Sequence, residues 1–268
     1  MVATRTDRIR IDYTLTFLTP FHFGTGIREG LVDRTVVKDG AGYLYVPGST
    51  FKGVVRERCE QLARLFEELD RDMHDRIIDP HEEKLALLTG FSNITTMITR
   101  IFGSHIQPGH LFFDDARQDQ KAIDEYDGVG EHEKGRYKNL QLDRYTQVRI
   151  NRLTCTAVPG ALYTSEFGLK GLQFHGSISG WLQCTPIDGQ PENPTYSLLL
   201  LLTGLHMVDR LGGNKSTGKG QCRCEITRVA MGTKEYIHGE WKAWFDRLDA
   251  LSLYSSDADT ARTQEEEK

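Results

Sequence analysis

The chain has 268 residues, of which 38% are hydrophobic and 26% charged, and its formal net charge at pH 7 is −5. This composition is typical of a globular protein and excludes an extended disordered chain, a collagen-like repeat and a membrane-spanning protein. The length suits one large domain or two small ones sharing a core, and the longest apolar run, residues 198–202, is far below the roughly 18 residues that a membrane span needs.

Hydrophobic periodicity predicts strands and helices in alternation. Residues 9–18 alternate as a half-buried strand, and a glycine-containing stretch follows Pro20. A short strand at 43–46 ends at a Pro-Gly turn. The helix predicted at 49–69 carries apolar residues at helical spacing, and Ser49 is its predicted N-cap.

The spacing of apolar residues also predicts the elements in the rest of the chain. The remaining predicted elements, in chain order, are a short strand at 111–114, a polar loop at 115–139, an alternating strand at 172–184, an apolar helix at 196–211, a strand at 222–229 and an amphipathic helix at 240–253. Strand, helix, strand followed by strand, helix, strand is the order of a ferredoxin-like or RRM-like core, so the expected fold class is α+β.

Charge and cysteine usage bear on the partners and the compartment. Acidic residues concentrate at 60–84 and 255–268, and the rest of the chain is net positive, so nucleic-acid binding stays open. The five cysteines do not indicate a disulfide framework, and the C-x-C pair Cys222 and Cys224 is expected to be buried on a strand. No structural zinc is expected, and the lack of an apolar signal-peptide core favours a cytoplasmic location.

Residues 213–219 meet the first seven positions of a P-loop, G-x-x-x-x-G-K, but the eighth position is Gly220 rather than Ser or Thr. The predicted context is also reversed, because this segment follows a helix and opens a strand, so nucleotide hydrolysis is not expected. The glycines of this loop would let backbone N–H groups approach an anion, and Lys215 and Lys219 add positive charge. A flexible solvated turn is the alternative interpretation.

Three segments taken together resemble a known family. They are TPFHFGTG at 19–26 leading into LVDRTVVKDG at 31–40, YVPGSTFKGVVRE at 45–57 and LGGNKSTGKGQC at 211–222. In order and spacing they are similar to the RAMP superfamily of CRISPR systems and, within it, to the backbone subunits of type III effector complexes. The resemblance extends over nearly the whole chain and is weakest at 70–139.

The resemblance implies an RRM-like core with insertions, copies of which stack along a guide RNA. It also implies a projecting hairpin within 141–171 and a loop aspartate that cuts the paired target RNA, which corresponds to Asp33. One domain would then cover 1–254, with insertions at about 70–139 and 141–171 and a disordered acidic tail at 255–268. The expected RNA-binding residues are Gly24, Gly26, Lys52, Arg56, Arg144, Arg149, Arg152, Gly212, Gly213, Asn214, Lys215 and Lys219.

A carboxylate at Asp33 suits the chemistry of RNA cleavage. Attack by the 2′-hydroxyl needs in-line geometry, removal of the 2′ proton and relief of charge on the phosphate. A carboxylate can act as the base or hold a divalent cation such as Mg²⁺. The alternative is that Asp33 pairs with Arg34 or Lys38 on a surface loop.

Basic residues supply the expected contacts to the RNA backbone. Lys52, in the first turn of the helix, opposes the macrodipole unless a phosphate binds there, and Arg56 lies one turn later on the same face. The arginines of residues 144–152, with Tyr145, are suited to follow a backbone and stack on a base. Solvated faces are the alternative for both sets, and His22 is expected to serve packing or a backbone contact.

The expected function is that of a guide-RNA (crRNA) binding backbone subunit of a type III CRISPR effector that cleaves complementary target RNA at regular intervals. Its expected partners are the crRNA, the target RNA and other effector subunits, including further copies or paralogues, and no membrane. Two alternatives stay open: a scaffold that binds crRNA without cutting, and a stand-alone endonuclease that processes repeat RNA. The latter usually relies on a histidine or tyrosine near the first helix, whereas here the first histidine after Ser49 is His74.

Overall fold

The structure of the protein is a computed structural model that describes residues 5–69, 97–104, 108–127, 136–190 and 193–253. The acidic tail predicted at 255–268 lies outside these residues, as does much of the insertion expected at 70–139. No helix within the described ranges is long and apolar enough to cross a membrane.

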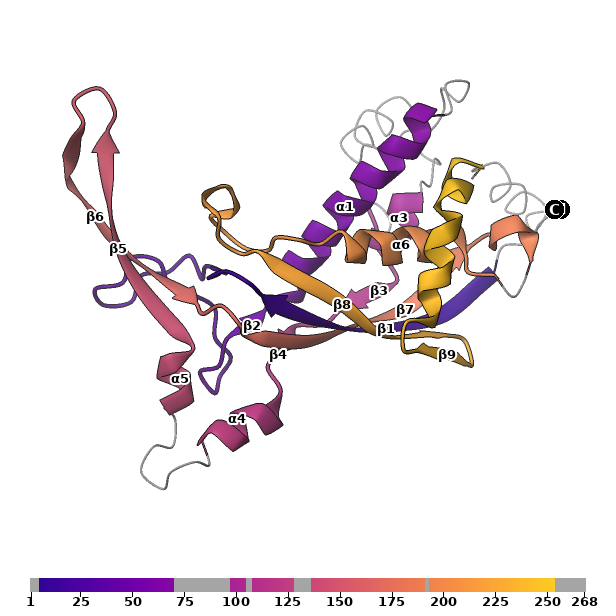
Figure 1. Cartoon of the computed structure of the whole chain (residues 1–268), viewed down its shortest axis with the longest axis horizontal. Helices are drawn as coiled ribbons and strands as arrows, with labels where there is room; N and C mark the ends of the chain where they lie inside the picture. Colours follow the sequence, from indigo (N-terminus) through magenta and orange to yellow (C-terminus); the bar gives the residue numbers. More distant parts are fainter. Residues whose placement is uncertain (1–4, 70–96, 105–107, 128–135, 191–192, 254–268) are drawn as a thin grey trace.

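An antiparallel sheet of seven strands forms the centre of the described chain (Figure 1). Its middle strand, β1 (Arg5–Phe17), pairs with β7 (Gln173–Cys184) along one edge and with β8 (Cys222–Met231) along the other. Because β3 (Leu111–Phe113) pairs with β7, the spatial order is β8-β1-β7-β3, that of the ferredoxin-like core predicted from the sequence. The outer strands are β2 (Tyr45–Val46), β4 (Ala116–Arg117) and β9 (Lys234–Ile237).

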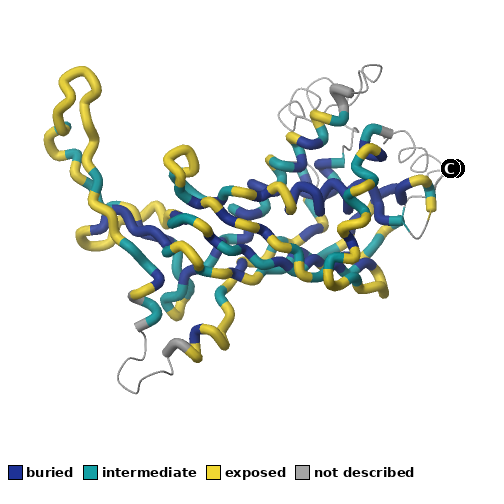
Figure 2. The backbone as a smooth tube through the Cα atoms, viewed as in Figure 1, coloured by how far each residue is buried: buried dark blue, intermediate teal, exposed yellow. Residues whose placement is uncertain are grey.

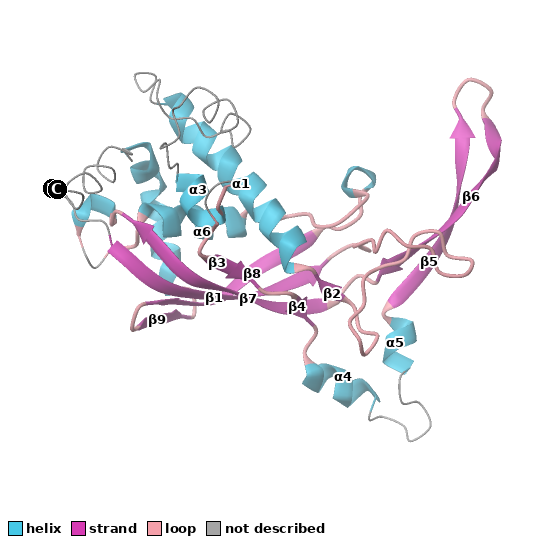
Figure 3. Cartoon of the chain, turned by 180° about the vertical axis from the view of Figure 1, so that it is seen from behind, coloured by secondary structure: helices cyan, strands magenta, loops and turns pink. Residues whose placement is uncertain are grey.

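Helices cover one face of this sheet (Figures 1 and 3). They are α1 (Gly48–Leu69), α3 (Met97–Phe102), α6 (Tyr196–His206) and the 3-10 helix η3 (Glu240–Leu253). Alternate side chains of β1, from Ile9 to Phe17, are buried, because successive residues of a strand point to opposite faces. The periodicity of β1 therefore identified the covered face of the sheet correctly.

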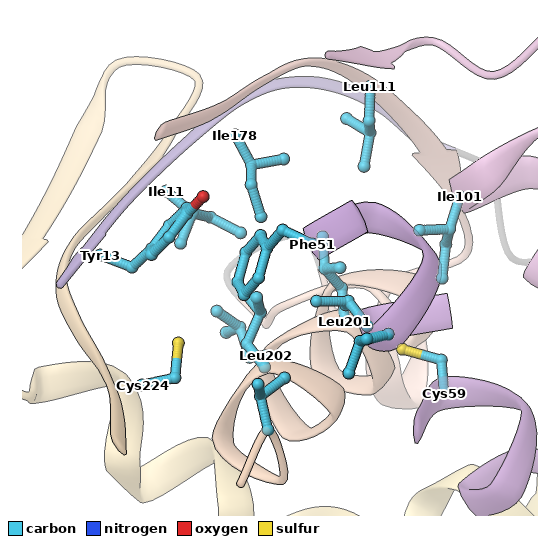
Figure 4. Close-up of a cluster of buried hydrophobic side chains, with 14 of the residues drawn as sticks. Ile11, Tyr13, Phe51, Cys59, Ile101, Leu111, Ile178, Leu201, Leu202 and Cys224 are labelled. Atoms are coloured by element: carbon cyan, nitrogen blue, oxygen red, sulfur yellow. The ribbon is translucent and has the colours of Figure 1, made fainter. Parts of the chain in front are cut away.

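The hydrophobic core lies between the sheet and helices α1 and α6 (Figure 4). Tyr13 of β1 stacks on Phe51 of α1, with ring centroids 4.5 Å apart. Ile11 and Ile178 are paired neighbours on β1 and β7, and both belong to this core. Helix α6 is buried from Tyr196 to Leu205. Its apolar residues lie on all sides of the helix, which is typical of a helix in the centre of a core.

Helix α1 begins at Gly48, and Ser49 is not its cap, contrary to the prediction. The N–H of Gly48 donates to Oδ1 of Asp115 at 2.9 Å, so a carboxylate from the loop after β3 satisfies the helix start. Gly48 packs so closely on β3 that a Cβ there would overlap the carbonyl oxygen of Phe113. Local sequence could not reveal this cap, because only the tertiary fold brings Asp115 to the helix.

Three other predictions are wrong in detail. The segment 115–139 contains β4 and two helices, α4 (Gln120–Asp127) and α5 (Arg136–Leu140), instead of a polar loop, and α4 buries Ile123. The helix predicted to reach residue 211 ends at His206, where the N–H of the next residue closes the last turn. The C-terminal helix η3 has 3-10 geometry with a kink at Arg247 rather than one continuous α-helix.

A two-stranded hairpin projects from this body (Figures 1 and 2). Its strands, β5 (Leu142–Asn151) and β6 (Thr156–Gly168), pair antiparallel and fall within the range 141–171. The residues of β6 from Ser165 to Gly168 are buried at the base of the hairpin, whereas much of its distal part is exposed. The base is therefore the part of the hairpin that packs against the rest of the chain.

All five cysteines are free thiols, of which Cys155 is exposed and the others are buried. Cys222 and Cys224 share the buried face of β8, which confirms the prediction for this pair. Burial raises the pKa of Cys222 to about 12 and the pKa of Cys224 still further. These thiols are hydrophobic packing residues and not reactive groups.

Candidate nucleic-acid interface

Asp33 lies on the loop between β1 and β2, and this loop is bound to the base of the hairpin. The N–H groups of Asp33 and Arg34 donate to the carbonyl oxygen of Thr164 at 2.9 and 3.2 Å. The N–H of Thr164 donates back to Oδ2 of Asp33 at 2.9 Å, and the N–H of Glu166 donates to the carbonyl of Arg34 at 2.9 Å. These reciprocal bonds fix the position of the Asp33 carboxylate relative to β6.

The Asp33 carboxylate is partly exposed and forms an ion pair with Arg28. Oδ1 lies 3.3 Å from Nη2 of Arg28, whose side chain is 80% exposed while that of Asp33 is 28% exposed. The alternative interpretation named Arg34 or Lys38 as the partner, and the structure assigns Arg28 instead. A pair this exposed contributes at most about 1 kcal/mol, so a substrate phosphate can compete for Arg28.

Glu166 is a buried carboxylate that links the Asp33 loop to the hairpin. Its side chain is 2% exposed and accepts from Lys38 at 3.3 Å and from Arg144 at 3.1 Å. The N–H of Val36 also approaches it at 3.5 Å. A buried charge needs such compensation, so Arg144, predicted to contact RNA, is already engaged within the chain.

The glycine-rich loop 211–220 packs on the segment that carries His22. The N–H of Gly213 donates to the carbonyl of His22 and that of Gly220 to the carbonyl of Pro20, both at 2.8 Å, while the N–H of Gly218 bonds to Lys215 within the loop. The predicted anion-binding nest is therefore wrong for these three glycines, because their N–H groups already have acceptors. Backbone geometry and close approach explain two of the loop's glycines instead: φ is positive at both, a Cβ at Gly212 would lie 2.6 Å from the carbonyl oxygen of His22, and a Cβ at Gly220 would overlap that of Leu211.

Lys219 joins this loop to the hairpin base through aromatic rings. Its Nζ lies 4.7 Å from the centroid of the Tyr145 ring and 5.2 Å from that of Phe167. The two rings contact each other edge to face, at 5.4 Å between centroids. A partly exposed cation above exposed Tyr145 is the chemistry that stacks a base and attracts a phosphate.

Lys52 and Arg56 contact a different part of the molecule. The Nζ of Lys52 lies 5.8 Å from the ring centroid of Phe113, and burial together with the charge of Arg56 lowers the Lys52 pKa. Arg56 donates to Oε1 of Glu60 at 2.8 Å and to the carbonyl of Gly103 at 3.2 Å. Arg56 thus has partners within the chain, whereas Lys52 makes no ion pair with any described residue.

The structure therefore gathers only some of the predicted residues. Those around the hairpin base are Gly24, Asp33, Arg144, Gly212, Gly213 and Lys219. Arg149 and Arg152 are exposed on the distal hairpin, and Gly26 and Lys215 are exposed on their loops. Asn214 has left-handed backbone geometry (φ 62°) and opens the 3-10 turn η2 (Lys215–Thr217).

Three residues that contact the Asp33 loop were missed from the sequence: Arg28, Thr164 and Glu166. Each acts on a partner in another segment, so no local pattern revealed it. His22, in contrast, is 4% exposed and its Nδ1 lies 2.8 Å from the carbonyl oxygen of Glu166. The prediction that His22 serves packing or a backbone contact is confirmed.

Comparison with known proteins agrees with this architecture. The model of the RAMP superfamily matches residues 14–223. A protein named CRISPR system Cms endoribonuclease Csm3, from Methanocaldococcus jannaschii, is 22% identical over 274 residues, which covers 96% of this chain and 95% of the relative. A chain in the cryo-EM structure of the Type III-B Cmr-beta bound to cognate target RNA has the same fold, with a TM-score of 0.51 and 13% identity over 81% of this chain and 96% of that chain.

Because the family match spans most of the sequence, the chain belongs to the RAMP superfamily, and within it the chain is similar to the Cas7-type backbone subunits of type III CRISPR effectors.

Proposed function

We propose that this chain binds guide RNA as a backbone subunit of a type III CRISPR effector and cleaves complementary target RNA at Asp33. The full-length similarity to a relative named as an endoribonuclease supports this activity. The observation that carries the proposal is the Asp33 carboxylate, which the N–H of Thr164 holds on an exposed loop at the base of a projecting hairpin. A fixed acid beside a hairpin is suited to act at one position of a paired strand.

The residues around Asp33 are suited to different roles in cleavage. Oδ2 is fixed by Thr164, and Oδ1 faces the exposed Arg28. A phosphate that draws Arg28 to itself would neutralise part of the charge that develops during attack, and it would free Oδ1 either to accept the 2′ proton or to bind a cation. General base catalysis of this kind is worth roughly 10² to 10⁴-fold.

A divalent cation such as Mg²⁺ fits this site with Asp33 as its protein ligand. The described residues hold no group of three or more His, Cys, Asp or Glu side chains that could form a complete metal site. Asp114 and Asp115 are held by other elements, where they accept from Ser177 of β7 and from the N–H of Gly48 of α1. One carboxylate suffices when substrate phosphates and waters fill the other positions, and the bound ion would relieve charge on the phosphate.

The proposal is tested with the assembled complex carrying its guide RNA and a matched target RNA, with and without EDTA. Regularly spaced products that disappear with EDTA are the expected result. Target binding without products would support the scaffold alternative and contradict cleavage. Cleavage of repeat RNA by the isolated chain would support the processing alternative.

A further inference from the structure

The imidazole of His22 is buried between the Asp33 loop, the hairpin base and the glycine-rich loop. Its side chain lies among the least exposed polar groups, at 4% exposure, and its ring packs on Phe167 at 5.5 Å between centroids. Its carbonyl oxygen accepts from the N–H of Gly213 at 2.8 Å. The ring is therefore held in one orientation by its surroundings.

The hydrogen bond of Nδ1 determines which ring nitrogen carries the proton. Nδ1 lies 2.8 Å from the carbonyl oxygen of Glu166, and a carbonyl oxygen only accepts, so Nδ1 must donate. A neutral imidazole with the proton on Nδ1 has its lone pair on Nε2. Among the described residues, no donor is bonded to that Nε2.

Two glycines border the Nε2 edge of the ring. A Cβ at Gly24 would lie 2.9 Å from Nε2, and a Cβ at Gly213 would lie 3.5 Å from the adjacent Cδ2. The same position at Gly213 is 3.9 Å from Nη2 of Arg34. Because both positions are glycine, neither places a side chain against this edge, and the Arg34 guanidinium lies near it.

A ligand group that meets Nε2 must be a hydrogen-bond donor. Phosphate oxygens only accept, so they fit Arg34 and not this nitrogen. The ribose 2′-hydroxyl is both a donor and an acceptor, and DNA lacks it. Base N–H groups are also donors, but a contact that serves every guide sequence must act on the sugar-phosphate chain.

We propose that Nε2 of His22 accepts a hydrogen bond from a ribose 2′-hydroxyl of the bound RNA, so that this residue discriminates RNA from DNA. The inference rests on the proposed function, since it requires that RNA lies along the Asp33 loop and the glycine-rich loop. It names a chemical basis for that preference: one neutral acceptor with no hydrogen-bond donor among the described residues, next to the guanidinium of Arg34.

The test measures how tightly the full-length chain binds single-stranded RNA, DNA of the same sequence, and RNA carrying 2′-deoxyriboses with unchanged bases. Two variants remove the acceptor in different ways: His22→Leu deletes it, and Gly24→Ala keeps the imidazole but places a methyl group against Nε2. Each is expected to lower RNA affinity about 3- to 10-fold, the effect of one hydrogen bond, with DNA affinity unchanged. Gly40→Ala is the matched control, because a Cβ there meets nothing within 4 Å.

The deoxy-substituted RNA tests the inference on the unaltered protein, so the result does not depend on the folding of a variant. The wild-type chain is expected to bind the deoxy-substituted RNA more weakly than RNA by the same factor. The Gly24→Ala chain is expected to bind both probes with equal affinity. Equal losses on RNA and DNA in both variants would overturn the inference and leave RNA binding in place. An effect that follows base identity instead of the sugar would overturn it too, whereas failure of the wild-type chain to bind any RNA would overturn the proposed function itself.

Discussion

Thr164 holds Asp33 through both its main-chain groups: its N–H donates to Oδ2 of the carboxylate, and its carbonyl oxygen accepts the N–H of the same residue. The two residues lie 131 positions apart. One belongs to the loop after β1 and the other to the projecting hairpin. The hairpin base and the proposed catalytic carboxylate therefore occupy a fixed relative position.

Glu166→Gln is expected to loosen this arrangement. The amide keeps the size of the side chain but loses the charge that Lys38 and Arg144 meet, so stability should fall by about 1–3 kcal/mol. Target cleavage should fall more than guide binding, because Glu166 fixes the loop that carries Asp33. Urea unfolding and cleavage assays measure both effects, and Glu125→Gln on the exposed face of α4 is the control. Unchanged stability would show that the buried carboxylate does not bind the two segments together.

Lys52 and Arg56 should differ in their response to salt, although the sequence suggested one role for both. Lys52→Ala is expected to lower RNA affinity and to reduce the slope of log affinity against log salt by about 0.7, the effect of one phosphate contact to a single strand. Arg56→Ala should leave that slope unchanged and cost about 1 kcal/mol of stability, because its bonds to Glu60 and Gly103 are lost. Titrations at low and high salt, with Lys121→Ala as control, distinguish the two. A lower slope in both variants would contradict the structural role of Arg56.

Burial, and to a lesser extent the charge of Arg34, lower the pKa of His22, against opposing contributions from Glu166. The unfolded chain then takes up a proton on this ring at a higher pH than the folded chain does. Stability should therefore fall as the pH drops below the ordinary pKa of about 6.5 and should not depend on this group above it. Urea unfolding on both sides of that value should show a smaller loss on acidification in His22→Leu than in the wild type. An equal loss in both proteins would contradict a neutral buried ring.

Thiol labelling checks the fold independently of RNA. Cys155 is the exposed thiol, whereas burial raises the pKa of Cys59, Cys222 and Cys224. A neutral alkylating reagent should modify one cysteine in the native protein and all five after denaturation, as mass spectrometry can count. Rapid modification of a second thiol in the native state would show that the core is packed differently.

The sequence predicted the central strands well because each buries one face. Strands β1, β7 and β8 alternate between apolar and polar residues. This alternation arises because one face of the sheet is covered by helices and the other is not. The polar helix α4 gave no such signal. Ile123 of this helix is buried, and a single buried position produces no hydrophobic periodicity in the sequence.

The candidate site was predictable only in part. Asp33 and the glycine-rich loop could be found through the family resemblance, but their partners could not, because they come from remote segments. The glycines looked suited to bind an anion, yet the N–H of Gly220 is taken by Pro20 and that of Gly213 by His22. Backbone hydrogen bonds between distant loops leave no pattern in the sequence of either loop.

The most direct test of the account compares target cleavage by complexes assembled with wild-type, Asp33→Ala and Glu29→Ala chains, each checked for bound guide RNA. Asp33→Ala is expected to keep the guide and to lose at least about 10²-fold in cleavage rate. Glu29→Ala, which removes an exposed acid of the same loop, is expected to cut like the wild type. An Asp33→Ala complex that still cuts at the normal positions and rate would contradict the central claim.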